Sequence, residues 1–499
     1  MQPVTGVRRD PAAWPPGLWL GAAAGALGWA LTALVLARGG GYLVVVPHLA
    51  VALPLAVVGT VTALACSAVG RPAVGPVTWL AVVAAAGAAW NFLVYWFRFG
   101  AETWALLIPL RKPGGLDFRD GLYEPALAFT TARSGWPPLT LILGKPFTLL
   151  GFPAARALEV GLLVAAAAAS VVLGALLAVR AEGGPGASGG RGASMPSGSG
   201  PDAGPLALGL VSALWLATSA GFMYELERGN IDLFALLFSL LGVWLLLRPE
   251  PRSPWWPALA LAVAVNLKLY PGVLLVLPLW RYRLRAVVPV LVTNLALLFI
   301  AGPGNVADTV RGQVAVESVA KAYWWGNHSA ASLARVLRGL SGAWPSWIYW
   351  PLLVVPLALW LVTMVLLVRR GWSARRAVLA AAACFPLMSV VPGISHDYKL
   401  VICVFPLAVV AAALATMRER GTLVWALLFG ALSWAMIQLS RASLVTAPSL
   451  QNSKYLMVVV LQALLLAVVA LTENGSGGET DPAALNGAAP HGAAEEETT

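Results

Sequence analysis

Long apolar stretches, separated by short polar or basic segments, run along most of the chain. A membrane-spanning helix needs about 20 apolar residues, so these stretches predict membrane spans. The pair within 255–280 is short and could form one helix broken near Pro271. The pattern predicts an all-α polytopic membrane protein with about 12–14 transmembrane helices. The expected spans are 17–37, 44–69, 76–97, 154–179, 205–222, 231–247, 255–268, 271–280, 286–301, 347–369, 377–393, 398–416, 422–440 and 453–471.

The composition supports a membrane protein and argues against a soluble domain or a nucleic-acid-binding protein. The chain has 499 residues, of which 59% are hydrophobic and 11% charged, with a mean hydropathy of +0.78. Soluble domains carry about 25% charged residues. The net charge of +11 does not indicate nucleic-acid binding, because the basic residues lie between apolar segments. Walker A, Rossmann and HExxH motifs are absent, so we expect no nucleotide cofactor and no metal.

The basic loops predict the orientation. With a cytoplasmic N-terminus, each loop predicted on the inner side carries at least one arginine, as the positive-inside rule requires. This alternation needs 255–280 to cross twice, with "LKLYP" turning outside. We therefore expect a multi-pass plasma-membrane protein with both termini in the cytoplasm. The inner arginines are Arg71, Arg180, Arg191, Arg248, Arg252, Arg281, Arg283, Arg285, Arg369, Arg370, Arg375, Arg376, Arg418 and Arg420.

Changes in composition divide the chain into regions. Residues 1–97 are expected to form N-terminal spans, and 98–471 a transmembrane core. Gly, Ser and Pro dominate 181–204, which predicts a flexible cytoplasmic linker within that core. The tail, 472–499, is acidic and is expected to be disordered.

The first large outer segment runs from Arg98 to Pro153 and contains "GGLDFRDGLYEPA". Asp117, Arg119 and Asp120 supply its candidate chemistry, although an exposed loop acid or a helix cap would also explain Asp117. The stretch "WPPLTLILGKPFTLLG" follows. It is apolar but too short to span comfortably, so it predicts a helix lying in the membrane interface.

Four charges are packed into the segment "MYELERGNIDLF". Asn230 can cap the following helix, which would place Asp232 in its first turn near the positive end of the helix dipole. Arg228 can pair with Glu225 or Glu227. Helix capping would account for only one or two of these four charged residues.

Three further outer segments carry candidate groups. In "NLKLYPGV", Pro271 breaks the helix and leaves Lys268 and Tyr270 at the break. Lys268 there could extend to the membrane surface or bind a lipid phosphate. The segment "WWGNHS" holds His328, which could be structural. The turn "ISHDYKL" carries more polar groups than a loop needs, namely His396, Asp397, Tyr398 and Lys399.

The order of four of these pieces resembles the GT-C superfamily of membrane glycosyltransferases, and glycosyltransferase family 87 in particular. The pieces are "DFRDGLYEPA" with "WPPLTLIL", then "ERGNIDLFALLFSLL", "NLKLYPGVLLVLPL" and "SHDYKLVICVFPL". The resemblance covers roughly residues 110–410. It implies transfer of a sugar from a polyprenyl phosphate, such as polyprenyl-phosphate mannose, to a lipid or glycan acceptor at the outer face. It also implies that this donor needs no metal. Relatives usually place the acidic loop after the first span, whereas three apolar segments precede it here.

The resemblance also implies roles for residues. Asp117 occupies the place of the catalytic base, with Asp120 as the second choice, and His396 matches a position near the acceptor. The remaining groups fall into two sets. Donor phosphate and lipid would be bound by Arg228, Lys268, Tyr270, Lys399 and Arg119. Acceptor contacts or support would come from Glu227, Asn230, Asp232, His328, Asp397 and Tyr398.

Two other functions fit much of this sequence. A transporter or flippase of a lipid-linked sugar would need the same cations without a base. Such proteins often show broken helices in both halves, and only 255–280 suggests one here. A glycan polymerase or ligase would also use large outer loops containing Arg and His.

Overall fold

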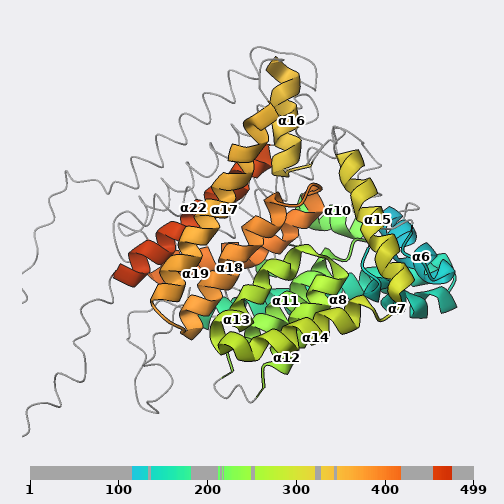
Figure 1. The fold of residues 1–499 in the computed structure, drawn as a ribbon, viewed down its shortest axis with the longest axis horizontal. Helices are drawn as coiled ribbons and strands as arrows, with labels where there is room; N and C mark the ends of the chain where they lie inside the picture. Colours follow the sequence, from blue (N-terminus) through green and yellow to red (C-terminus); the bar gives the residue numbers. More distant parts are fainter. Residues whose placement is uncertain are drawn as a thin grey trace, which may run out of the picture.

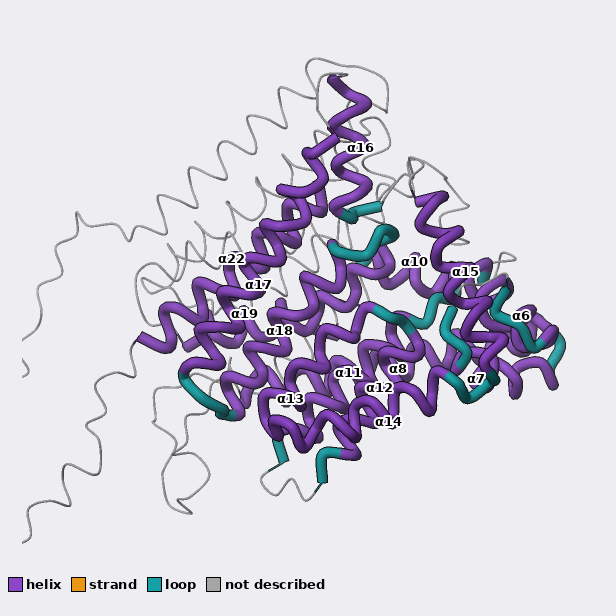
Figure 2. The backbone as a smooth tube through the Cα atoms, viewed as in Figure 1, coloured by secondary structure: helices purple, strands orange, loops and turns teal. Residues whose placement is uncertain are grey.

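A computed structural model describes residues 115–132, 136–180, 219–248, 253–320, 327–341, 346–416 and 453–474, with isolated positions from 209 to 216. Helices dominate this described part, and its β pairing is an isolated bridge between Asn327 and His396. The helices gather into one bundle (Figure 1), joined where described by short loops (Figure 2). The expected N-terminal spans, the 181–204 linker, the 422–440 span and the 472–499 tail lie outside the described residues, apart from residues 472–474.

The polar segment that precedes the first long helix folds into five short helices, one of which, η2, is a π-helix. Their bounds are Leu116–Phe118 (α5), Arg119–Tyr123 (η2), Glu124–Ala128 (α6), Leu139–Gly144 (α7) and Lys145–Leu149 (η3). The expected interfacial stretch thus forms an apolar helical segment, α7 and η3. Leu143 and Leu149 expose 44% and 85% of their surface there.

The rest of the bundle alternates longer helices with short 3₁₀ turns. The helices are Phe152–Arg180 (α8), Ala220–Arg228 (α10), Asp232–Leu246 (α11), Trp255–Leu267 (α12), Val276–Tyr282 (α13), Val287–Leu298 (α14), Pro303–Ala320 (α15), Ala330–Ser341 (α16), Tyr349–Arg369 (α17), Ala374–Val390 (α18), Val404–Thr416 (α19) and Ser453–Asn474 (α22). The 3₁₀ turns are Tyr270–Leu275 (η5), Arg283–Ala286 (η6), Ser346–Ile348 (η7) and Asp397–Cys403 (η8).

Within the described residues, three helices are long and apolar enough to cross a membrane: Phe152–Arg180, Tyr349–Arg369 and Lys454–Leu471. Two pairs of helices also pass when each pair is taken as one broken span. The chain bends by 114° between Gly221–Arg228 and Asp232–Leu246, and by 89° between Tyr270–Leu298 and Pro303–Ala315. The chain is an all-α polytopic membrane protein, as the hydropathy pattern predicts. The total of 12–14 spans stays a prediction, because several expected spans fall outside the described residues.

Apolar side chains hold the bundle together. Helix α11 packs against α8 and α12, and α12 packs against α14. On the other side, α18 contacts α17, α19 and α22. Leu240, Leu261 and Phe405 are almost completely buried in these contacts. Helix α11 begins at Asp232 and α18 ends at Val390.

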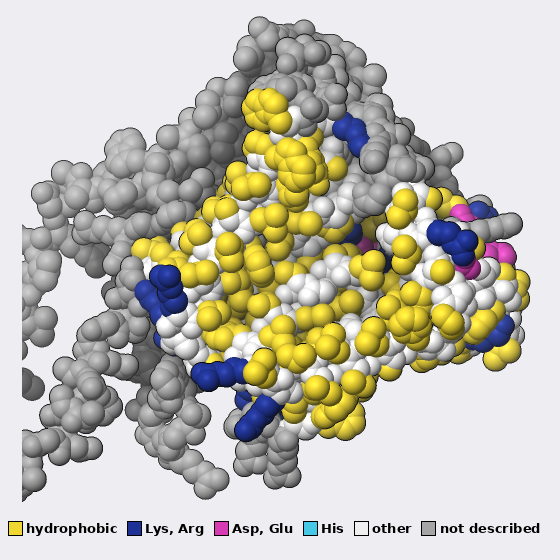
Figure 3. All heavy atoms as spheres, viewed as in Figure 1, with side chains coloured by type: hydrophobic (Ala, Val, Ile, Leu, Met, Phe, Trp, Pro, Cys, Tyr) yellow, Lys and Arg dark blue, Asp and Glu magenta, His cyan; other side chains and the backbone are white. Residues whose placement is uncertain are grey.

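The two ends of the bundle differ in charge. In Figure 3, Lys and Arg lie over the region of α13 and the α17–α18 turn with no acidic side chain visible beside them, whereas near α6 the visible acidic side chains lie among Lys and Arg. The sequence-derived candidates come from the end where α10, α11 and η8 meet.

Candidate active site

The segment "MYELER" is helical, and it forms most of α10. The Ser219 hydroxyl accepts a hydrogen bond from the Phe222 backbone N–H at 3.0 Å, which caps the start of the helix. The helix ends at Gly229, whose φ of 68° lies in the left-handed region that favours glycine. A Cβ at this glycine would lie 2.6 Å from Cβ of Phe118. The turn therefore brings α10 directly against α5, where Asp117 lies.

Asp117 is held by two groups that follow it by more than 100 residues. The Arg228 guanidinium forms a salt bridge with Oδ1 of Asp117, and the Asn230 amide donates to Oδ2 at 3.1 Å. The expected pairing of Arg228 with Glu225 or Glu227 is wrong. The Glu227 side chain is exposed, and Glu225 is turned toward the start of α11.

Glu225 caps α11. Its Oε1 accepts from the backbone N–H groups of Asp232, at 3.0 Å, and Leu233, at 3.3 Å, which are among the donors that a helix start leaves unpaired. The expectation that Asn230 caps this helix is wrong. Asn230 Oδ1 accepts instead from Ile231, the residue before the helix, at 2.8 Å. Its amide is thereby oriented toward Asp117.

Asp232 collects groups from the break between α12 and η5. Lys268 has extended backbone angles (φ −144°, ψ 134°), and Pro271 begins the next turn, so the predicted break is present. The Tyr270 hydroxyl donates to Oδ1 of Asp232 at 2.8 Å. Lys268 Nζ lies 3.9 Å from the same oxygen, and the Lys268 side chain is only 15% exposed. This lysine therefore points into the site rather than out along the surface.

Trp136 covers Lys268, and sequence reasoning did not select it. Lys268 Nζ lies 4.0 Å from the centre of the indole, a cation–π contact. The backbone oxygen of Trp136 accepts from Thr309 Oγ1 at 3.0 Å, which ties it to α15. Gly121 gives the ring its space, because a Cβ there would lie 2.7 Å from the indole. Aromatic residues beside Pro-Pro are common in loops, so the sequence carried no clear signal.

The "SHDYKL" turn packs on α10 through η8. The ring of Tyr398 lies 5.6 Å from the ring of Tyr224 and 5.6 Å from that of His396. Lys399 Nζ lies 4.8 Å from the centre of the Tyr270 ring and donates to the Ile394 carbonyl at 2.6 Å. The turn thus joins the same cluster as Asp117 and Asp232. The side chain of Asp397 lies outside the described part.

Arg119 and Asp120 lie apart from this cluster, whereas His328 lies at its edge. Arg119 Nε and Asp120 Oδ1 form a pair at 2.8 Å, with side chains 50% and 57% exposed. His328 is buried, and its backbone N–H donates to the Ser395 carbonyl at 2.6 Å. It therefore lies beside the "SHDYKL" turn and helps to anchor it through the backbone.

A buried ion pair at the start of α8 supports the cluster by holding the C-terminal end of α10. Arg156 and Glu159, at the start of α8, form a salt bridge with side chains 6% and 0% exposed. The Arg156 guanidinium also donates to the carbonyls of Leu226 and Glu227, at the C-terminal end of α10. Sequence reasoning placed this pair inside an ordinary span. Two opposite charges three residues apart at the start of an apolar helix were the available signal.

The assembled groups could carry out acid–base chemistry next to an anion. Asp117 presents a carboxylate fixed by two donors, while Lys268, Arg228 and Lys399 bring positive charge to the same end of the bundle. Among the described residues, no group of three His, Cys, Asp or Glu side chains could hold a metal ion. That the reaction needs no metal stays a prediction.

Comparisons with known proteins place these residues in a family. No curated protein and no solved structure matches the chain. The model of "Glycosyltransferase family 87" matches residues 136–392, slightly more than half of the sequence. The match includes Trp136, Arg228, Asn230, Asp232 and Lys268, and it begins after Asp117. The chain therefore belongs to glycosyltransferase family 87, a GT-C type family of membrane glycosyltransferases.

Proposed function

We propose that this membrane glycosyltransferase moves a sugar, expected to be mannose, from a polyprenyl phosphate to a lipid or glycan acceptor. The reaction takes place on the extracytoplasmic side and inverts the anomeric centre. The observation that supports this most directly is the meeting of Asp117 with Arg228, Lys268 and Lys399 at one end of the bundle. These groups come from four segments that are far apart in the sequence.

In the proposed reaction, the cations bind the donor phosphate and Asp117 is the base. Asp117 accepts the proton of the acceptor hydroxyl, and the oxygen attacks the anomeric carbon. The bond from that carbon to the phosphate oxygen breaks, and the polyprenyl phosphate leaves with the electron pair. A carboxylate on the face opposite the leaving group is what inversion requires. Lys268, Arg228 and Lys399 balance the charge on the phosphate as it leaves.

Arg228 links the two halves of this mechanism. It pairs with Asp117 in the described structure, and an incoming phosphate offers it a second anion. As Arg228 turns toward the phosphate, Asp117 keeps the Asn230 amide at 3.1 Å and one of its oxygens becomes available to the acceptor. Donor binding would therefore prepare the base.

The surrounding groups fit supporting roles. Tyr270 and Asp232 hold Lys268 toward the site, through the 2.8 Å hydrogen bond and the 3.9 Å ion pair. Tyr398 and His396 form a wall next to α10, where an acceptor hydroxyl could enter. The arginine-rich opposite end supports an extracytoplasmic site by the positive-inside rule.

The decisive experiment compares Asp117→Asn with Asp120→Asn in purified protein supplied with polyprenyl-phosphate mannose. Asp117→Asn keeps the size of the side chain but removes the base, so we expect sugar transfer to fall about 10³-fold. Asp120 is exposed and paired with Arg119, so its variant is expected to transfer sugar at close to the wild-type rate. Transfer by Asp117→Asn at the wild-type rate would refute the assignment of the base.

Two additional measurements separate the rival functions. A flippase would move the lipid-linked sugar between leaflets of a vesicle without forming a new glycosidic bond, in the wild type and in Asp117→Asn alike. A polymerase or ligase would transfer a lipid-linked glycan rather than a single sugar. Product analysis with several polyprenyl-phosphate sugars, a pentose donor among them, would identify the substrate.

A further inference from the structure

A cavity of about 570 Å³ lies at the end of the bundle remote from Asp117. Helix α11 starts at the site with Asp232, and Arg281 Nη2 donates to the Arg248 carbonyl, 3.0 Å away, just beyond the end of that helix. At 1.5 Å per residue, α11 separates the two places by roughly 22 Å. Nothing in the proposed reaction uses this cavity.

Positive charge faces the cavity, and none of the described residues that line it is acidic. Arg281 and Arg283 line it, and Arg285 lines an adjoining cavity of about 470 Å³ with them. No acidic residue is among the lining residues of either cavity. Arg281 is oriented by stacking 5.1 Å over the Trp372 ring. The Arg283 backbone N–H donates to the Leu279 carbonyl, but the guanidinium groups of Arg283 and Arg285 make no hydrogen bond or ion pair with another described residue.

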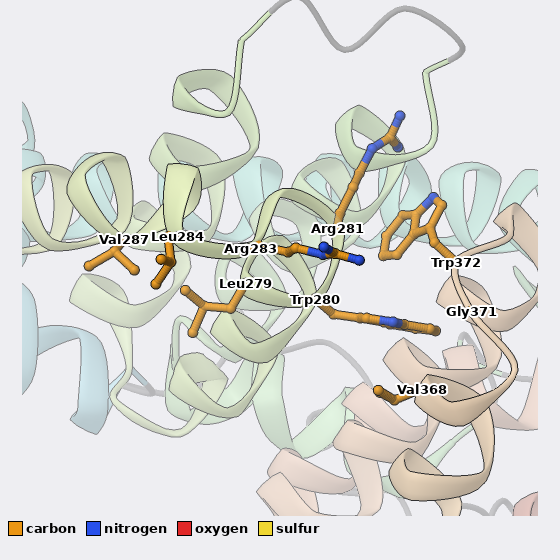
Figure 4. A pocket seen from close by; sticks show the side chains of 9 residues that line it. All are labelled: Leu279, Trp280, Arg281, Arg283, Leu284, Val287, Val368, Gly371 and Trp372. Carbon is orange, nitrogen blue, oxygen red and sulfur yellow. The ribbon is translucent and has the colours of Figure 1, made fainter.

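The remaining wall is apolar. Trp280 and Trp372 line the cavity, and their rings meet edge to face with centroids 5.0 Å apart (Figure 4). Aliphatic side chains from α13, η6, α14 and α17 complete the wall, and Leu284 is 86% exposed. A large apolar side chain this exposed beside arginines suits a surface that meets lipid. The aliphatic residues are Leu279, Leu284, Val287 and Val368.

We propose that this cavity binds an anionic membrane phospholipid, with the phosphate at Arg281 and Arg283 and an acyl chain along the aliphatic wall. A guanidinium matches the geometry of a phosphate and can donate to two of its oxygens. Basic pockets between transmembrane helices at the membrane surface suit lipid headgroups for this reason. Arg283 has a φ of 54°, a conformation that L side chains rarely adopt, which fits a residue retained for its guanidinium.

The lipid would act as a structural ligand between two hairpins. The cavity lies between the α13–η6 turn and the α17–α18 turn, where Trp280 and Arg281 both contact Trp372. A bound headgroup would add charged contacts across this junction. A sugar donor bound here would lie too far from Asp117 to react there.

The test uses the full-length protein in detergent, with native mass spectrometry and titrated phosphatidylglycerol or phosphatidylcholine as probes. We expect tighter binding of phosphatidylglycerol, and at least a tenfold loss of its affinity in the Arg281→Gln, Arg283→Gln double variant. The matched control is Arg180→Gln with Arg369→Gln. It removes the same charge from arginines of the predicted inner loops that do not line the cavity, and less than a twofold change is expected.

Two further arms separate the possible sources of the phosphate. Val368→Phe narrows the apolar wall, so it is expected to weaken lipid binding without changing the binding of inorganic phosphate. Complete competition of the lipid by millimolar inorganic phosphate would show a free-anion site and overturn the proposal. Equal affinity for the two phospholipids, or equal losses in the double variant and its control, would also overturn it. Size-exclusion profiles of every variant show whether the fold is kept.

Discussion

The two ends of the bundle hold their charges in different ways. At the Asp117 end, acidic and basic groups from distant segments pair with one another, as Arg228 does with Asp117. At the opposite end, Arg281, Arg283 and Arg285 lie close together in one turn, and none of them has an acidic partner among the described residues. The paired charges at the Asp117 end come together only in the complete fold. The three arginines at the opposite end lie within five consecutive residues, so the local sequence alone brings them together.

The difference follows from solvation. A charge removed from water is costly unless a partner and hydrogen bonds compensate it, so the buried groups at the Asp117 end come in pairs. Exposed arginines keep their contact with water or lipid headgroups and need no partner. Mutations at the Asp117 end are therefore expected to affect folding and catalysis together. Mutations at the arginine end are expected to affect mainly the contacts of the protein with water and lipid headgroups.

The largest effect on stability is expected at the buried pair of Arg156 and Glu159. Arg156→Met leaves the Glu159 carboxylate buried without a countercharge, which would lower the free energy of unfolding by about 3–5 kcal/mol. Thermal unfolding followed by circular dichroism measures this change. Adding Glu159→Leu is expected to restore much of the loss, because the buried charge is then gone.

The control for this variant is Arg311→Met. Arg311 pairs with Asp308 three residues earlier, but its side chain is 76% exposed, so the expected loss is about 0–1 kcal/mol. Equal losses at the two sites would show that burial does not distinguish the pairs.

Gly229 ranks next. Gly229→Ala combines a φ of 68° with a Cβ only 2.6 Å from Phe118 Cβ, so we expect a loss of about 2–4 kcal/mol and reduced sugar transfer. Gly302→Ala is a matched control, because its φ is 89° but nothing lies within 4 Å of the added Cβ. A loss of about 1 kcal/mol is expected there. If both variants lose the same stability, crowding against Phe118 is unimportant.

Lys268→Ala tests the cation nearest to Asp232. We expect the KM for the donor to rise about tenfold, or about 1.4 kcal/mol, with a smaller change in kcat. Lys145→Ala serves as the comparison, since Lys145 also lies over an aromatic ring, 5.9 Å from that of Phe129, but has no acidic partner among the described residues. An unchanged KM in Lys268→Ala would move the phosphate contact to Arg228 or Lys399.

The smallest effect is expected at the arginine end. Arg283→Gly removes a side chain from a residue with a φ of 54°, and is expected to raise the free energy of unfolding by up to about 1 kcal/mol. Arg285→Gly removes the same charge from a residue without positive φ, and a small loss is expected. Chemical denaturation of both variants in one detergent makes the comparison. A loss in both would show that Arg283 is held without strain.

Local patterns predicted much of the fold. Apolar length predicted α8, α17 and α22, and Pro271 predicted the break that exposes Lys268 to the site. These features depend on neighbouring residues, so a single sequence contains them. The order of the four polar pieces also predicted the family.

The pairing of charges could not be read from the sequence. Glu225 and Glu227 are near Arg228 in the chain, yet Arg228 reaches Asp117, 111 residues away, because α10 folds back against α5. Asn230 has the side chain of a helix cap, but Glu225 supplies the cap from the preceding helix. Local proximity favoured the wrong partners in both cases, since the turn at Gly229 decides which side chains face each other.

The π-helix η2, which follows Asp117, makes the length of this segment important. A π turn contains one residue more than an α turn, and it places Gly121 under the Trp136 ring. Removing one residue from Arg119–Tyr123 would turn the following residues by roughly 100° and bring a bulkier side chain to that ring. We therefore expect that related sequences tolerate substitutions at the exposed positions of Arg119–Tyr123, but not insertions or deletions within it.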